Sequence, residues 1–122
     1  MSYSVDKYQN IWQAKISEIL TDDDIIGLKR KLQIFHEGYA LSANGLVDLR
    51  TLTDMDIDLS TLNNLTSEME VHLSRNEIKM AFMVESPIQY GIARMFRIIL
   101  SPWKTDVRLF EEEKEALEWI SV

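Results

Sequence analysis

The sequence contains no cysteine and only two histidines, which removes several kinds of active site. Without a thiol there is no disulfide, no thiolate nucleophile and no thiolate metal site. His36 and His72 lack the spacing of metal ligands, so surface or helix-end roles are favoured for both. No glycine-rich phosphate loop and no Gly-x-Ser-x-Gly elbow is present. We therefore expect no catalytic residue, no metal and no cofactor; a hydrolase or transferase is the least supported alternative.

Positive charge is also scarce, with 13 lysines and arginines against 20 aspartates and glutamates and a net charge of -7. Binding to a phosphate backbone needs a concentrated basic face, so nucleic-acid binding is excluded as a general activity. No apolar run approaches the roughly 18 residues that cross a bilayer. The polar start, MSYSVDKYQN, has no apolar signal-peptide core, so we expect a cytoplasmic location.

Proline and glycine are few and scattered, with two and four residues respectively. No linker, repeat or low-complexity segment is visible, and 46% hydrophobic content is enough for one core. We therefore expect a single domain over residues 1–122.

Alternation and helical spacing predict strands and helices in turn along the chain. The expected order is a hairpin over Tyr3–Glu18, a helix capped by Thr21 and running to about Glu37, a short strand at Leu46–Leu49, a helix capped by Ser60, a strand at Ile78–Val84, a helix from Ser86–Pro87 to Pro102, a strand at Thr105–Phe110 and a helix at Glu111–Ile120. This order predicts an α/β fold with a mixed sheet of four or five strands, an N-terminal antiparallel hairpin, a parallel centre and about four helices.

An acidic stretch follows the short strand at Leu46–Leu49 and is expected to be a loop. We predict that it binds a protein partner through Arg50, Asp54, Asp56, Asp58 and Ser60. The alternating aspartates also resemble the start of a calcium loop, but Leu59 and Leu65 stand where such a loop needs glycine and glutamate. The alternative is that these acids cap the following helix and solvate the loop.

The helix from Ser86 to Pro102 carries two further predictions. Its expected core stripe is Ile88, Ile92, Met95 and Ile99, widened by Phe96 and Leu100. Tyr90, Arg94 and Arg97 fall on the opposite side, where they predict an anion site or, alternatively, a stack paired with acids of a neighbouring element.

Large apolar side chains predict a second kind of site. A pocket between sheet and helix would be lined by Met83, Ile92, Met95, Phe96 and Trp103, although methionine at such spacings is more often gap-filling core. Trp103 is the tryptophan expected to be exposed, and with Phe96 and Leu100 it would form a hydrophobic patch.

Three segments together resemble the SpoIIAA-like family of small bacterial proteins, which is related to the STAS fold of anti-sigma-factor antagonists. They are VDLRTLTDMD, PIQYGIARMFRIIL and VRLFEEEKEALEWI, and with the hairpin they cover nearly the whole chain. The resemblance implies a sheet of four or five strands packed with helices and a role in binding. The family has also been likened to CRAL-TRIO lipid-transfer domains, which implies a lipid or other apolar ligand as an alternative.

The STAS pattern has an Asp-Leu pair, a second aspartate and then a phosphorylatable serine. Asp48, Leu49 and Asp56 match it, whereas Ile57 stands in place of the serine. The resemblance therefore implies the fold without the usual phosphorylation. Our leading hypothesis is a non-enzymatic regulatory module, expected to form a homodimer, that presents the acidic loop to a protein partner. The alternative is a carrier or sensor of an apolar small molecule.

Overall fold

The computed structural model describes residues 3–8, 11–36, 44–58, 60–64, 67, 77–101 and 105–121. The elements follow in the order β1 (Tyr3–Tyr8), β2 (Ile11–Thr21), α1 (Asp22–His36), β3 (Gly45–Asp56), β4 (Ile78–Met83), α3 (Pro87–Leu100), β5 (Thr105–Phe110) and α4 (Glu113–Ile120). Residues 60–64, between β3 and β4, are also helical.

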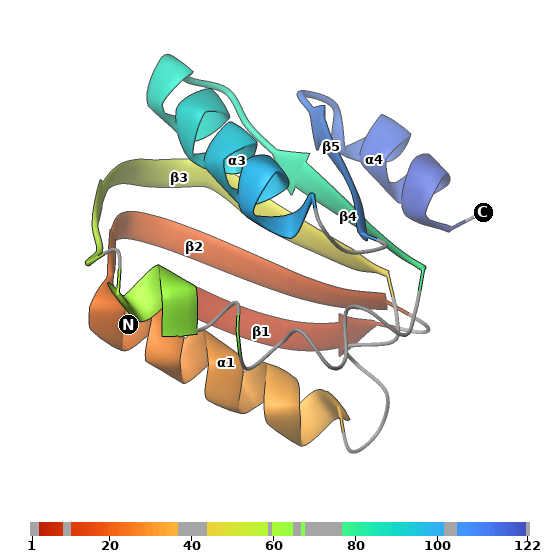
Figure 1. Cartoon of the computed structure of the whole chain (residues 1–122). Helices are drawn as coiled ribbons and strands as arrows, with labels where there is room; N and C mark the ends of the chain where they lie inside the picture. Colours follow the sequence, from red (N-terminus) through yellow and green to blue (C-terminus); the bar gives the residue numbers. More distant parts are fainter. Residues whose placement is uncertain are drawn as a thin grey trace.

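The five strands form one sheet in the order β1-β2-β3-β4-β5. β1 and β2 are antiparallel, and every later pair is parallel. Right-handed crossovers between successive parallel strands place the connecting helices on one face, and Figure 1 shows α1 and α3 in front of the sheet. α4 follows the last strand and packs against β3, β4 and β5 on the other face. The predicted mixed sheet with an antiparallel hairpin and a parallel centre is confirmed.

The central strand β4 divides its side chains between two apolar layers. Met80 and Phe82 point into the larger layer, which α1 and α3 cover. Ala81 and Met83 point into a smaller layer with Ala116 of α4. Alternate residues of a strand face opposite sides, so a strand buried on both faces reads as a continuous apolar run.

A bulge in the middle of β3 reverses which of its residues face the core. Asp48 pairs with Lys15 of β2 and Thr51 pairs with Ser17, so three steps along β3 match two along β2. An extra residue in one strand shifts the alternation by one position. Before the bulge the alternation is regular, so Leu46, Asp48 and Arg50 face the α4 side while Val47 and Leu49 face the larger layer. Beyond the bulge Leu52 is the next residue that faces the larger layer.

A second irregularity follows almost at once. Leu52 pairs with Glu18 and Asp54 with Ile19, so two steps along β3 match one along β2. Glu18 has a φ of 62°, in the left-handed region that most residues avoid, and its carbonyl accepts a hydrogen bond from the Thr53 hydroxyl at 2.9 Å. The side chains of this strand and the residue after it that pack into the larger layer are Val47, Leu49, Leu52, Met55 and Ile57.

The predicted loop after Leu49 is wrong, because β3 continues to Asp56. With two bulges the inward residues recur at intervals of three from Leu49 to Met55, and this spacing does not look like strand alternation. The helix at residues 60–64 follows, and its first backbone bonds run from Thr61 and Leu62 to the Asp58 carbonyl. The predicted cap at Ser60 is therefore wrong as well, since Ser60 already lies inside the helix.

The starts of α1 and α3 agree with the sequence, whereas α4 begins at Glu113 rather than Glu111. The Thr21 hydroxyl accepts from the Asp24 backbone N–H at 3.3 Å, and the Asp24 carboxylate accepts from the Thr21 backbone N–H at 3.0 Å. Ser86 and Gln89 form the same reciprocal box at α3, whose first residue is the predicted proline. The predicted stripe of α3 is partly wrong: Ile88 is 41% exposed, and the buried residues are Gln89, Ile92, Ala93 and Leu100.

Gly45 and Trp12 lie opposite each other where β2 and β3 begin to pair. Trp12 is 4% exposed, and a Cβ on Gly45 would lie 2.1 Å from its ring. A Cβ on Gly91 of α3, in contrast, would meet nothing within 4 Å. The two glycines are therefore required to different degrees by the packing of the chain.

We predict opposite effects for alanine at these two glycines. Gly45→Ala should lower the free energy of unfolding by about 2 kcal/mol, because the buried indole has no room to move. Gly91→Ala should raise it by up to about 1 kcal/mol, because alanine favours a helix and the added methyl is unobstructed. Urea denaturation of both variants is the measurement, and a stabilised Gly45→Ala protein would contradict the packing described.

Candidate functional site

The candidate site lies where β3 runs past the ends of its neighbours. The last pair between β3 and β4 joins Asp48 to Met83, so β3 loses that neighbour beyond this point. α3 begins soon after β4 ends, and α4 begins soon after β5 ends. In open parallel sheets, ligand sites commonly lie beyond the carboxyl ends of the strands.

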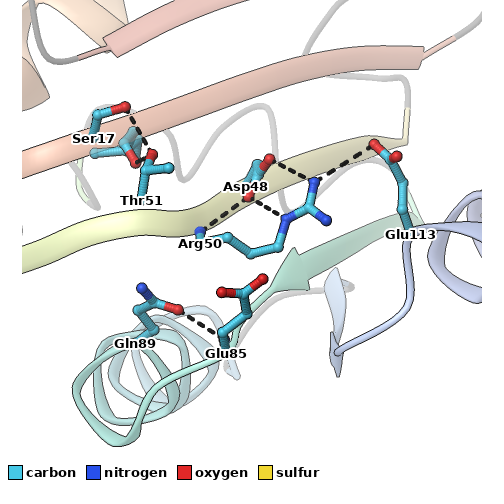
Figure 2. A network of polar contacts seen from close by, with 8 residues as sticks. Ser17, Asp48, Arg50, Thr51, Glu85, Gln89 and Glu113 are labelled. Atoms are coloured by element: carbon cyan, nitrogen blue, oxygen red, sulfur yellow. Dashed lines mark hydrogen bonds and ion pairs between the residues drawn. The ribbon is translucent and has the colours of Figure 1, made fainter.

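Arg50 and Asp48 form a two-point ion pair on the α4 side of β3. The guanidinium donates from Nε to Asp48 Oδ1 at 3.0 Å and from Nη2 to Oδ2 at 2.9 Å, and the Arg50 backbone N–H donates to Oδ1 at 3.0 Å. Figure 2 shows Glu113, the first residue of α4, reaching the same guanidinium at 3.9 Å. Such forked pairs fix both side chains in one orientation.

The ionisation of this pair follows from its contacts. Partial burial alone would raise the pKa of Asp48, but the side-chain and backbone hydrogen bonds from Arg50 outweigh burial, and the pKa is lowered. The hydrogen bond to Asp48 raises the pKa of Arg50 against partial desolvation, with smaller contributions from Glu113 and Glu85. The pair is therefore fully charged at neutral pH.

Gln89 connects α3 to the bulged part of β3. It is 4% exposed, and its Nε2 donates to the Leu52 carbonyl at 2.9 Å. Its Oε1 accepts from the backbone N–H groups of Glu85 at 2.7 Å and Ser86 at 3.2 Å. The sequence analysis missed Gln89, although Ser-Pro-Ile-Gln at residues 86–89 has the spacing of a capping box.

The predicted partner-binding residues do not form one group. Arg50 belongs to the ion pair with Asp48, whereas Asp54, Asp56 and Asp58 are exposed near the end of β3 and Ser60 lies in the next helix. Arg50, Asp54 and Asp56 stand on β3 rather than on a loop, which corrects the expected geometry, and Asp58 lies just beyond the strand.

The three exposed aspartates are held mainly through backbone contacts. Asp54 Oδ1 accepts from the Met55 backbone N–H at 2.7 Å, and the Asp58 backbone N–H donates to Asp22 Oδ1 at 3.0 Å. Within the described part of the chain, no lysine or arginine forms an ion pair with Asp54, Asp56 or Asp58. No group of three or more His, Cys, Asp or Glu side chains among the described residues could hold a metal ion.

Tyr90 and Arg94 adopt the stacked arrangement that was the alternative to an anion site. The Tyr90 hydroxyl donates to Glu111 Oε1, and the Arg94 guanidinium lies 5.6 Å from the centre of the Tyr90 ring. The hydrogen bond to Glu111 raises the pKa of Tyr90. Both side chains border an open hollow of about 380 Å³ with Glu85 and Pro87. Arg97 is exposed on the same helix, and anion binding there stays a prediction.

The predicted apolar pocket is not assembled. Met83 is fully buried in the layer under α4, whereas Ile92 and Phe96 pack in the layer on the other side of the sheet. Phe96 stacks on Phe82 with 6.0 Å between ring centres. Met95 is half-buried on α3, and Trp103 lies outside the described residues.

The expected patch of Trp103, Phe96 and Leu100 is wrong for Leu100, which is 7% exposed. The other tryptophans are structural: Trp12 is in the core, and Trp119 packs on Phe110 beside Lys79 and Arg108.

The side chains of His36 and His72 lie outside the described residues. No helix in the described part of the chain has the length and apolar character needed to span a membrane.

Solved structures with a SpoIIAA-like fold are similar to this chain. An uncharacterized protein of the DUF3478 family from Shewanella loihica PV-4 is 17% identical, with a TM-score of 0.67 over 97% of this chain and 91% of that chain. The anti-sigma factor antagonist SpoIIAA in its unphosphorylated form is 12% identical, with a TM-score of 0.66 over 98% of this chain and 97% of that chain.

A third structure, the phosphorylated Bacillus cell fate determinant SpoIIAA, is 11% identical, with a TM-score of 0.59 over 97% of this chain and 98% of that chain. No protein-family model and no curated protein matches the sequence. The likeness to SpoIIAA structures confirms the predicted SpoIIAA-like, STAS-related fold.

We predict that Asp48 stabilises the fold in a pH-dependent way. Because its native pKa is lowered, the stabilisation is complete above the unfolded value of about 3.9 and is lost as the pH falls through the native value. Asp48→Asn should lower the free energy of unfolding by about 2 kcal/mol at neutral pH. The difference from the wild type should shrink below about pH 4 in urea denaturation series.

A second Asp-x-Arg pair provides the control. Asp106 and Arg108 are 3.5 Å apart, with side chains 55% and 57% exposed, whereas those of Asp48 and Arg50 are 16% and 29% exposed. Exposed pairs contribute little, so Asp106→Asn should leave the unfolding curve unchanged at both pH values. Equal effects of the two substitutions, or an Asp48→Asn effect that does not vary with pH, would contradict the account of the buried pair.

Proposed function

We propose that this chain is a non-enzymatic protein-interaction module that acts by presenting a fixed acidic surface to a basic region of a partner protein. The fold likeness supports the class of function, because one of the similar structures is an anti-sigma factor antagonist, a protein that acts through another protein. The geometry of β3 supports the choice of surface.

The observation that carries the proposal is the set of exposed carboxylates at the end of β3. We call Asp54, Asp56 and Asp58 the β3 acidic surface. Asp22 at the start of α1 adds a fourth carboxylate beside it, through its contact with the Asp58 backbone. Pairing with β2 continues as far as Thr21 and Asp56, so Asp54 and Asp56 stand on a held strand. A rigid surface of one sign favours a partner of the opposite sign and speeds its association.

The residue after Asp56 supports a constant surface rather than a switched one. In the resemblance to the STAS pattern, Ile57 takes the place of the phosphorylatable serine, and its side chain packs against the larger apolar layer. An isoleucine cannot accept a phosphoryl group. The surrounding aspartates would supply negative charge at all times, which is the chemical feature that phosphorylation would add in a switched protein.

A lipid carrier has no comparable support. Of the described side chains proposed for an apolar pocket, Met83 lies on one side of the sheet and Ile92 and Phe96 on the other, and Ile92 and Met83 are already buried by this chain's own packing. We therefore retain only the protein-interaction function.

The test is charge reversal at the β3 acidic surface. Asp56→Lys/Asp58→Lys should reduce recovery of the partner at least about tenfold in quantitative affinity purification from the native cells, since about 1.4 kcal/mol of lost binding free energy suffices. Far-ultraviolet circular dichroism should not change, because both side chains are exposed and the helix start uses the Asp58 carbonyl.

The matched control is Asp106→Lys/Glu118→Lys, which makes the same change of charge at exposed residues of β5 and α4. It should leave recovery of the partner unchanged. Equal recovery by the β3 variant, or equal loss by the control, would refute the assignment of the surface.

A further inference from the structure

β5 is the last strand of the sheet, and no described strand lies beyond its outer edge. It runs from Thr105 to Phe110 without a proline, and its pairing with β4 is free of bulges. The helices that pack against β5 are α3 and α4, and both also pack against β3. They therefore lie over the two faces of the sheet and not beside its edge. The free backbone groups of such an edge are a template for another strand.

The pairing with β4 fixes which backbone groups of β5 face outward. The Val84 backbone N–H donates to the Phe110 carbonyl at 3.0 Å, so the backbone groups of Phe110 point toward β4. The direction of these groups alternates along a regular strand, so those of Thr105, Val107 and Leu109 point outward. Within the described part of the chain, no residue forms a hydrogen bond with these outward groups. The outward residues are therefore spaced symmetrically about Val107.

Two charged side chains of β5 flank the same central residue. Val107 points into the larger apolar layer, so Asp106 and Arg108 share the α4 side, where Arg108 lies 4.8 Å from the centre of the Trp119 ring. Within one chain, Asp106 and Arg108 form a long ion pair of 3.5 Å, and their side chains are 55% and 57% exposed. Opposite charges on either side of a central residue are complementary to a copy of the same strand that runs antiparallel.

We propose that β5 pairs with β5 of a second copy of this chain, antiparallel and centred on Val107, so that the two sheets become one. In this register Val107 faces Val107 of the copy as a hydrogen-bonded pair, and Thr105 faces Leu109 of the copy. Each of these residues then has partners for its outward N–H and C=O groups. Asp106 faces Arg108 of the copy, and the two-fold arrangement makes this pair twice on one face of the sheet.

The same charges disfavour the neighbouring registers. Moving the centre by one residue keeps the outward backbone groups paired but places either Asp106 or Arg108 opposite its own copy. Like charges directly opposite each other destabilise a strand pair. The order of side chains on β5 therefore specifies one register, which is unusual for a short edge strand with free backbone groups.

The expected contact is weak and separate from the β3 acidic surface. One short strand per copy is a small interface, so we expect a reversible dimer with a dissociation constant of roughly 100 µM. Urea denaturation and partner recovery at low micromolar concentration therefore report on the monomer, and Asp106 remains a suitable control position in both. Because the two contacts use different strands, the two proposals stand or fall separately.

Sedimentation velocity of the full chain, at concentrations up to about 1 mM, tests the register through a charge exchange. Arg108→Glu and Asp106→Arg should each weaken the dimer at least about tenfold, because like charges then face each other twice. An equimolar mixture of the two variants should dimerise like the wild type, since both facing pairs in the mixed dimer are opposite in charge. Both positions are exposed, so the circular dichroism should not change.

The matched controls make the same changes of charge far from β5. Asp6→Arg lies on β1, the opposite edge of the sheet, and Arg30→Glu lies on α1; both residues are exposed. Neither should change the dissociation constant.

Amide hydrogen exchange tests the backbone pairing independently. Exchange at Val107 and Leu109 should slow as the concentration of the wild-type chain rises, because their N–H groups gain partners, whereas Arg108 already points toward β4 and should not respond. A chain that is monomeric at about 1 mM, a mixture of variants that stays monomeric, controls that dissociate like the β5 variants, or exchange at Val107 that is independent of concentration would each overturn the proposal.

Discussion

The two bulges in β3 decide which residues in the second half of this strand face the core and which face outward. Before the first bulge, regular alternation places Asp48 and Arg50 on the α4 side, while Val47 and Leu49 fill the layer under α1 and α3. After it, Leu52 and Met55 are the next inward side chains, and Asp54 and Asp56 are exposed. Beyond Asp48, β3 has no pairing with β4. There the buried Gln89 of α3 donates a hydrogen bond to the Leu52 carbonyl and so holds the irregular part of β3. A buried amide that made none of these bonds would be costly, so this contact ties the start of α3 to one conformation of β3.

This constraint separates two groups of charges with different roles. Asp48 and Arg50 satisfy each other at short distance and are partly buried, which makes them a structural pair. The exposed aspartates nearer the end of β3 have no such partner among the described residues. Charges on a held strand that no described lysine or arginine pairs with are available to another molecule, and this difference is the physical basis of the proposed function.

Much of the fold could be predicted because the local signals agree with each other. The cap and proline at Ser86 and Pro87 mark the start of α3, and the apolar run at β4 identifies a strand buried on both faces. The later part of β3 could not be predicted, because two extra residues spread its inward side chains to a spacing of three. Gln89 was missed as a contact to the sheet because its partner there, the Leu52 carbonyl, is a backbone group of β3 beyond the last pair with β4, which no sequence pattern marks.

Site-specific photocrosslinking in the native cells tests the central claim most directly. A photoreactive residue at Thr53 of β3, or at Asn63 in the helix that follows, would lie beside the β3 acidic surface, whereas Lys114 of α4 would not; all three positions are exposed. The account predicts that Thr53 and Asn63 cross-link to the same protein and that Lys114 does not. Cross-linking of a partner from Lys114 alone would contradict it.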